Sequence, residues 1–205
     1  MPAPAKLFLA SSNPGKLKEY RALAEASTIP SVSVELELLP NFASLPAFNE
    51  NAPTFAENAA GKALHYSRLQ KELVFADDSG LVVPSLGGAP GVHSARYAGK
   101  GATNAQRIEK LLQELRGKPD EERAAHFVCA IALARQGQAL AVVTDRVDGE
   151  ILPAPRGSGG FGYDPVFYFP ALKKTFAELS PEEKNRHSHR GKAFGKLLAA
   201  LSSML

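Results

Sequence analysis

The chain has 205 residues, of which 44% are hydrophobic and 22% are charged, a balance typical of a globular protein with a substantial core. Its 24 Lys and Arg side chains outnumber its 21 Asp and Glu side chains by only three, too few for non-specific nucleic-acid binding. Every apolar run is too short for a membrane span or a signal peptide, so we expect a cytoplasmic protein that binds neither nucleic acid nor membrane.

The first half of the chain predicts two strands and two helices. A short apolar strand over residues 6–10 is followed by a helix that Asn13 suits as cap and Pro14 as first residue. Residues 32–38 alternate apolar and polar side chains, which predicts a half-buried strand. A capping-box sequence then predicts a second helix that begins at Thr54.

The second half predicts a central hairpin between helices. An apolar strand over residues 72–76 runs into the sequence DDSG, and a third helix is predicted after a cap at Thr103. Two long strands, residues 124–134 and 138–147, are predicted to form a hairpin, and a capping box at Ser180 opens the C-terminal helices. This order predicts an α/β or α+β fold around a mixed sheet, in a single domain that spans the whole chain.

Cys129 is the only cysteine, so the chain cannot form an internal disulfide. It lies in the apolar run HFVCAIALA, which predicts a buried strand. With no obvious cationic neighbour, we expect an unreactive core thiol rather than a reactive one.

The segment SSNPGK, residues 11–16, lies between the first strand and the first helix. Backbone N–H groups at the start of a helix attract anions, and Lys16 adds a full positive charge there. The segment is not a Walker A loop, because Ala10 stands where that motif needs glycine and Leu17 where it needs Ser or Thr. A phosphate site and a capped turn with a surface lysine both fit this pattern.

Two adjacent carboxylates, Asp77 and Asp78, follow the apolar strand 72–76. Many α/β proteins bind ligands beyond the C-terminal ends of their strands. Successive side chains of a strand point to opposite faces, so the two carboxylates are expected to have different roles. Either one could hold Mg²⁺ or take a proton from water, and the alternative is a polar strand-to-turn cap.

Two glycine-rich segments follow. The long loop over residues 85–101 predicts a lid, a wall of a site or a subunit contact. The glycines of residues 156–165, RGSGGFGYDP, match a dinucleotide-binding pattern, but a proline and the apolar VFYF follow instead of a helix. We therefore predict that Phe161 and Tyr163 stack on a base and that Asp164 accepts hydrogen bonds from ring N–H groups.

The segment SPEEKNRHSHRGKAF, residues 180–194, concentrates positive charge. Its cationic or ionisable side chains are Lys184, Arg186, His187, His189, Arg190 and Lys192. A solvated helix face, a nucleic-acid patch and one wall of an anion site are the alternatives. Taken with the helix start at residues 11–16, the carboxylate pair and the segment 156–165, it predicts a site for a nucleoside triphosphate with Mg²⁺.

Five motifs, in order and spacing, resemble the Ham1/inosine triphosphate pyrophosphatase family over residues 6 to about 198. The motifs are SSNPGK, FADDSGL, LGGAPGVHSARYAG, GSGGFGYDPVF and AELSPEEKNRHSHRGKA. The bacterial members of this family are dITP/XTP pyrophosphatases. The resemblance implies a Mg²⁺-dependent, homodimeric hydrolase that cleaves the non-standard triphosphates ITP, dITP and XTP to the monophosphate and pyrophosphate and so cleanses the nucleotide pool. It also implies a long mixed sheet flanked by helices, in two lobes with an active-site cleft between them.

The resemblance also assigns residues. It makes Asp78 the proton acceptor and a metal ligand, and it implies a second metal carboxylate for which Glu50 is the candidate, next to Asn49. His93, Arg186 and His187 depart from the family pattern and carry no assigned role. The implied substrate-binding residues are Ser11, Ser12, Asn13, Pro14, Gly15, Lys16, Ser79, Phe161, Gly162, Tyr163, Asp164, Lys184, His189 and Arg190.

Two other function classes fit parts of the pattern. A phosphotransferase would use the same triphosphate but would need an acceptor site, for which the sequence offers no candidate. A nucleotide-binding or RNA-binding module without catalysis would not need Asp78 and would extend a basic stripe beyond the pocket, which the small net charge of +3 disfavours.

Overall fold

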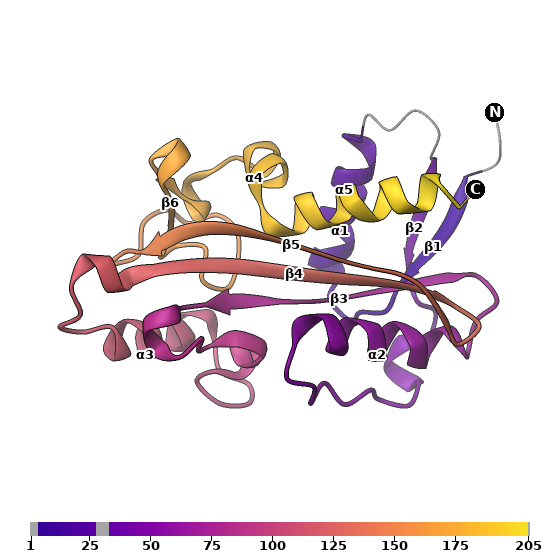
Figure 1. Cartoon of the computed structure of the whole chain (residues 1–205), viewed down its shortest axis with the longest axis horizontal. Coiled ribbons are helices and arrows are strands. Elements are labelled where there is room, and N and C mark those ends of the chain that lie inside the picture. The colour runs from indigo at the N-terminus through magenta and orange to yellow at the C-terminus, as the bar shows by residue number, and fades with distance from the viewer. Residues whose placement is uncertain (1–3, 28–32, 205) are drawn as a thin grey trace. The chain divides into compact units, whose positions relative to one another are not determined.

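The computed structural model describes residues 4–27 and 33–204 (Figure 1). Its helices are α1 (Pro14–Glu25), α2 (Phe55–Ser67), α3 (Asn104–Glu114), α4 (Pro181–His187) and α5 (His189–Ser202). Its strands are β1 (Ala5–Leu9), β2 (Val34–Leu38), β3 (Leu73–Val82), β4 (Ala124–Arg135), β5 (Gln138–Ile151), β6 (Phe167–Phe169) and β7 (Lys174–Thr175). The strands form one mixed sheet in the order β2-β1-β3-β4-β5-β6-β7, which confirms the predicted fold class.

The chain divides into two compact units. The first comprises Met1–Asp78, Cys129–Asp145 and Arg190–Leu205, and the second comprises Ser79–Val128 and Arg146–His189. The long strands β3, β4 and β5 each contribute residues to both units. Within residues 4–27 and 33–204, no helix combines the length and the apolar character that a membrane crossing requires.

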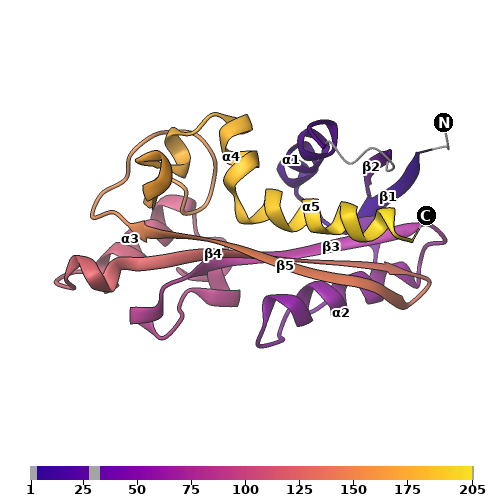
Figure 2. The same cartoon turned by 45° about the horizontal axis from the view of Figure 1, so that its top comes forward.

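Alternate side chains of the strands in the first unit face two different cores. Phe75 of β3 packs with Tyr20 of α1 and Phe194 of α5, with ring centroids 5.1 Å and 6.2 Å away. Its neighbours Val74 and Ala76 belong to the core that packs against α2. Figures 1 and 2 accordingly show α1 and α5 on one face of these strands and α2 on the other. Consecutive β3 residues therefore meet different helices.

The second unit has its own apolar core. Ile108 and Leu111 carry the apolar stripe of α3 into it. The rings of Phe127 on β4 and Phe167 on β6 pack there with centroids 4.5 Å apart. Tyr163 and Val166 anchor the glycine-rich segment that precedes β6 in this core, and Leu179 anchors the residues that precede α4.

The predicted helix caps are confirmed. Asn13 accepts a hydrogen bond from the Gly15 N–H at 2.9 Å, and Thr54 caps α2 through its side chain. Full capping boxes are present at Thr103 and Ser180. Position 32, within the predicted strand 32–38, lies outside the described residues, and β2 begins at Val34.

The prediction that β3 ends at residue 76 is wrong. The strand continues to Val82, so the sequence DDSG lies within it and does not form a turn. Gly80 makes this possible, because a Cβ at that position would lie 2.7 Å from the Gly91 carbonyl oxygen and would also clash with Ser94. The Ser94 hydroxyl also accepts a hydrogen bond from the Leu81 N–H at 2.9 Å. Close packing against residues 91–94 thus outweighs the local turn preference of DDSG.

Candidate active site

Asp77 and Asp78 lie side by side on β3 and contact different helices of the first unit. Asp77 contacts Lys16 of α1 and Arg190 of α5, whereas Asp78 accepts a hydrogen bond from Asn58 of α2. These contacts follow the alternation of Phe75 and its neighbours along the same strand. The predicted separation of roles between the two carboxylates therefore has a geometric basis.

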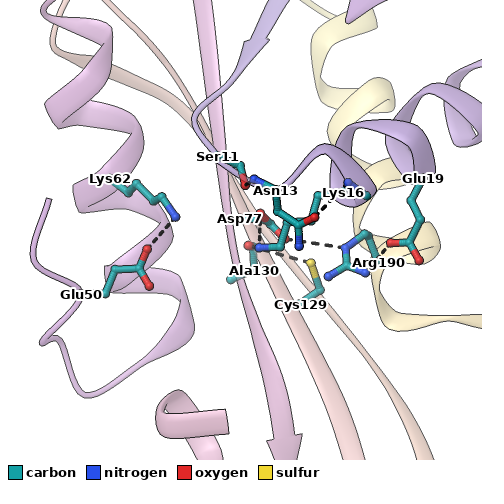
Figure 3. Close-up of polar contacts among 11 residues, drawn as sticks. Ser11, Asn13, Lys16, Glu19, Glu50, Lys62, Asp77, Cys129, Ala130 and Arg190 are labelled. Atoms are coloured by element: carbon teal, nitrogen blue, oxygen red, sulfur yellow. Dashed lines mark hydrogen bonds and ion pairs between the residues drawn. The ribbon is translucent and has the colours of Figure 1, made fainter. Parts of the chain in front are cut away.

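Asp77 is the centre of a buried ion-pair cluster, drawn in Figure 3. Its side chain has no exposed surface, and its Oδ1 lies 2.8 Å from Lys16 Nζ. Its Oδ2 lies 3.7 Å from Arg190 Nε, and Arg190 Nη1 lies 2.6 Å from Glu19 Oε2. Burial alone would raise the pKa of Asp77, but Lys16 and Arg190 lower it to about 2. Asp77 is therefore ionised at any physiological pH and is unsuited to accept a proton.

Asp78 has the opposite electrostatic character. Its Oδ2 accepts a hydrogen bond at 3.0 Å from the Nδ2 of Asn58, a residue that is 1% exposed. Burial and, to a lesser degree, repulsion by Glu50 raise the pKa of Asp78 to about 6, against the opposing effects of Asn58 and Lys16. A half-buried carboxylate with such a pKa is suited to general-base chemistry near neutral pH.

Glu50 precedes α2 and forms an ion pair with Lys62 of that helix. The two side chains meet at 2.6 Å between Oε1 and Nζ, as Figure 3 shows. Burial alone would lower the pKa of Lys62, but Glu50 raises it above its usual value. Glu50 and Lys62 thus bring a paired charge close enough to act on Asp78.

The donor set around Asp78 fits Mg²⁺. In the described part of the chain, no three His, Cys, Asp or Glu side chains cluster into a ready-made metal site. Mg²⁺ in nucleotide enzymes is held by one or two carboxylates together with substrate phosphates, so such a cluster is not needed. The repulsion between Asp78 and Glu50 is the kind of interaction that a divalent cation beside them would reverse.

The start of α1 has the form of an anion site. Ser11 is buried and its hydroxyl accepts a hydrogen bond from the Asn13 N–H at 3.1 Å, while Ser12 and Gly15 are exposed. The first turn of α1, which begins at Pro14, contains no acidic residue. Its positive end is thus not neutralised by a neighbouring side chain of the same turn.

The second unit holds a separate charged cluster at its glycine-rich segment. Lys184 Nζ lies 2.7 Å from Asp164 Oδ2 and 4.5 Å from the centre of the Phe161 ring. The same oxygen accepts a hydrogen bond from the Phe161 N–H at 2.8 Å. Phe161 is 44% exposed, although Lys184 and Asp164 are buried. Gly160 has φ of 69°, and a Cβ there would clash with the Asp164 carboxylate, so this turn requires glycine.

Tyr163 is not placed to stack on a base, contrary to our prediction. It is 3% exposed, and its hydroxyl donates a hydrogen bond at 2.9 Å to the Ser94 carbonyl oxygen. The large ring is more stable in the apolar core than in solvent, and the carbonyl satisfies its hydroxyl. Of the two predicted stacking residues, only Phe161 presents exposed ring surface.

The cationic segment is divided between the two units. His189 is buried and stacks on Phe127, with centroids 4.8 Å apart and an interplanar angle of 13°. Arg190 has partners different from those of Lys184, because it pairs with Glu19 and Asp77 of the first unit. The segment is therefore not a uniform solvated face, and its exposed cations are Arg186 and Lys192. The roles of Lys184, His189, Gly162 and Ser79 toward substrate stay predictions.

Three residues of the first unit were missed from the sequence. Asn58 and Lys62 lie four residues apart on α2, a spacing that places both side chains on one face of the helix. Two polar residues at that spacing in an alanine-rich helix were a usable signal. Glu19 offered none, because its partner Arg190 is 171 residues away in the chain.

Cys129 is fully buried, as predicted. Burial, assisted by the nearby Asp77 charge, raises the pKa of its thiol to about 12. We expect a thiol-specific reagent such as dithiobis(nitrobenzoate) to label the native protein at least about a hundredfold more slowly than the denatured protein. Rapid labelling of native protein, at one thiol per chain, would contradict the buried position.

Comparisons with known proteins place the chain in one family. A model described as "Ham1 family" matches residues 7–200. The dITP/XTP pyrophosphatase of Geobacillus kaustophilus is 53% identical over 92% of its own length and 94% of this chain. That of Gloeobacter violaceus is 50% identical over 94% of its length and 96% of this chain. A solved Ham1 protein from Coxiella burnetii superposes with a TM-score of 0.85 at 41% identity, covering 97% of this chain and 99% of that one.

Proposed function

The chain belongs to the Ham1 family, and we propose that it hydrolyses non-standard purine nucleoside triphosphates to the monophosphate and pyrophosphate. The proposed substrates are ITP, dITP and XTP, and the proposed cofactor is Mg²⁺. The names of its relatives support the reaction class. The observation that carries the proposal is the half-buried Asp78 carboxylate, which accepts a hydrogen bond from Asn58 at 3.0 Å and whose pKa burial raises to about 6. The cytoplasmic location, the homodimeric state and the absence of a nucleic-acid partner stay predictions.

Asp78 would act on the attacking water. The water oxygen forms a bond to the α-phosphorus, the bond from that phosphorus to the bridging oxygen breaks, and pyrophosphate leaves with the bond electrons. The proton of the water passes to Asp78, whose carboxylate Asn58 orients through its hydrogen bond of 3.0 Å. Asp78 and Glu50 would hold Mg²⁺, which when bound supplies positive charge against the phosphate oxygens.

The start of α1 would stabilise the leaving pyrophosphate. Charge accumulates on the bridging oxygen as the bond breaks, and the positive end of a helix opposes that charge. Lys16 adds a full charge at the same place. An ammonium group has three N–H donors, and the ion pair with Asp77 engages Lys16 Nζ from one side.

Phe161 and Lys184 would recognise the base. The exposed ring of Phe161 can stack on a purine, while Lys184 is fixed by its 2.7 Å contact with Asp164. Inosine and xanthosine carry a carbonyl oxygen at position 6, which a cationic donor satisfies. Adenosine carries an amine there and would leave the donor unpaired, a mismatch that such sites reject strongly.

Product analysis tests the proposal. With Mg²⁺ we expect ITP, dITP and XTP to release pyrophosphate as the first product, and ATP to react at least about a hundredfold more slowly in kcat/KM. GTP is included because its base has the same 6-carbonyl group as inosine but carries an amino group at position 2. Its rate therefore shows whether the site discriminates at position 2 of the purine. Orthophosphate as the first product would contradict the proposal, and binding without turnover would favour a non-catalytic nucleotide-binding module.

A further inference from the structure

Asp77 has no part in the reaction as proposed, yet it is fully buried next to the proposed proton acceptor. Its cluster contains two cations and two anions, Lys16, Arg190, Asp77 and Glu19. Buried ion pairs seldom stabilise a fold more than well-packed apolar side chains would, because each charge loses its hydration. The cluster therefore calls for an explanation other than stability.

The cluster fixes one end of a flexible side chain. Lys16 lies in the first turn of α1, where an unrestrained lysine samples many rotamers. Asp77 belongs to a central strand and holds Lys16 Nζ at 2.8 Å through Oδ1. Arg190 approaches the other oxygen of Asp77 and also contacts Glu19, three residues after Lys16 on the same helix. Asp77 is thus held in place relative to the helix that carries Lys16 (Figure 3).

We propose that Asp77 is a positioning residue that holds the Lys16 ammonium group where it meets the leaving pyrophosphate. This inference rests on the proposed function. Only 19% of the Lys16 side chain is exposed, so the Asp77 contact leaves little freedom to the charged end. A misplacement of about 1 Å at a reacting group can cost on the order of a hundredfold in rate. The two adjacent aspartates then divide the work, with Asp78 acting on the water and Asp77 acting through Lys16.

A double-mutant cycle tests whether Asp77 acts through Lys16. The four proteins are wild type, Asp77→Asn, Lys16→Met and the double variant, compared in kcat and KM for ITP at fixed Mg²⁺. Asn keeps the shape of Asp77 but removes the charge that holds the ammonium group. We expect Asp77→Asn to lower kcat by about tenfold or more when Lys16 is present, and by less than about twofold in the Lys16→Met background.

Lys18→Met is the matched control, because Lys18 is an exposed cation two residues further along α1. We expect it to change kcat/KM by less than about twofold at moderate salt. Equal losses from Asp77→Asn in both backgrounds would assign Asp77 a structural role and overturn the inference. A higher kcat for Asp77→Asn than for wild type would also overturn the inference. It would mean that the ion pair with Asp77 holds the Lys16 ammonium group away from the substrate phosphate.

Two further results separate this inference from the proposed function. Unchanged turnover in Lys16→Met, with pyrophosphate still released by the wild type, would refute the inference and leave the proposed function standing. A wild type that releases no pyrophosphate would refute the proposed function and the inference with it. Asp77→Asn removes one of the two carboxylates that face the buried Arg190 and leaves Glu19 as the other, so the thermal unfolding of this variant is measured in parallel. If that variant fails to fold, the same cycle is run in the Arg190→Gln background, which removes the positive charge that Asp77 faces. We again expect Asp77→Asn to lower kcat strongly only when Lys16 is present.

Discussion

Asp78→Asn is expected to lower kcat for ITP by about a hundredfold or more, the scale of loss for a general base. Asn has the same shape, so the hydrogen-bonded position beside Asn58 can be kept while the proton acceptor and one proposed metal ligand are lost. KM is expected to change much less, because the start of α1 and the Phe161 cluster remain intact. Steady-state kinetics at saturating Mg²⁺ measure both constants.

The same substitution is expected to stabilise the fold at neutral pH. The pKa of Asp78 rises from 3.8 to about 6 on folding, so the folded state binds the proton more tightly than the unfolded state. The carboxylate therefore destabilises the fold above pH 6, and this effect disappears as the pH falls from about 6 to 4. With a discount for partial exposure, the cost is about 1 kcal/mol, or about 2 to 4 °C in Tm. Calorimetry above pH 7 measures the difference.

A matched control separates the Asp78 site from a general effect of charge removal. Asp148→Asn removes an exposed carboxylate of β5 and is expected to change neither kcat nor Tm measurably. Near-wild-type turnover by Asp78→Asn would mean that another carboxylate acts as the general base, and Glu50 is the next candidate. Lower stability of Asp78→Asn at neutral pH would contradict the electrostatic account of the raised pKa.

Lys184→Met is expected to have the second largest effect, on both activity and stability. It leaves the buried Asp164 carboxylate without its cation, which should lower the free energy of unfolding by about 3 kcal/mol. It should also lower kcat/KM for ITP by at least about tenfold, the loss of one charge-assisted hydrogen bond. Urea unfolding and steady-state kinetics measure the two effects separately.

Two companion variants separate the loss of stability from the loss of activity. Lys184→Met combined with Asp164→Asn removes both buried charges, so stability should largely return while kcat/KM stays low. Arg186→Ala removes an exposed cation two residues away and should change kcat/KM by less than about threefold at moderate salt. Equal losses for Lys184→Met and Arg186→Ala would mean that the segment acts as a diffuse positive patch and not through a placed lysine.

Local sequence signals predicted much of the fold. The caps at Asn13, Thr54, Thr103 and Ser180 depend on side chains within three residues of their partners, so each could be recognised directly. The hairpin turn was equally local, because Gly137 takes a positive φ of 78° that few other residues adopt. The different surroundings of Asp77 and Asp78 followed from strand geometry alone.

Contacts between segments that are distant in the chain could not be predicted from the sequence. Arg190 meets Glu19 from the far end of the chain, so no spacing rule reveals that Asp77 is held from two helices. The length of β3 depends on how closely Gly80 packs against Gly91 and Ser94. The aromatic pair of the glycine-rich segment looks equivalent in sequence, and only the core of the second unit shows that Tyr163 is buried and Phe161 exposed.

The position of bond cleavage is the most direct test of the proposed chemistry. The enzyme is incubated with ITP and Mg²⁺ in ¹⁸O-labelled water, and the products are analysed by mass spectrometry. Attack of water on the α-phosphorus, assisted by Asp78, predicts one ¹⁸O atom in inosine monophosphate and none in pyrophosphate. Label in pyrophosphate would place the attack on the β-phosphorus, and label in orthophosphate on the γ-phosphorus, and either result would contradict the account.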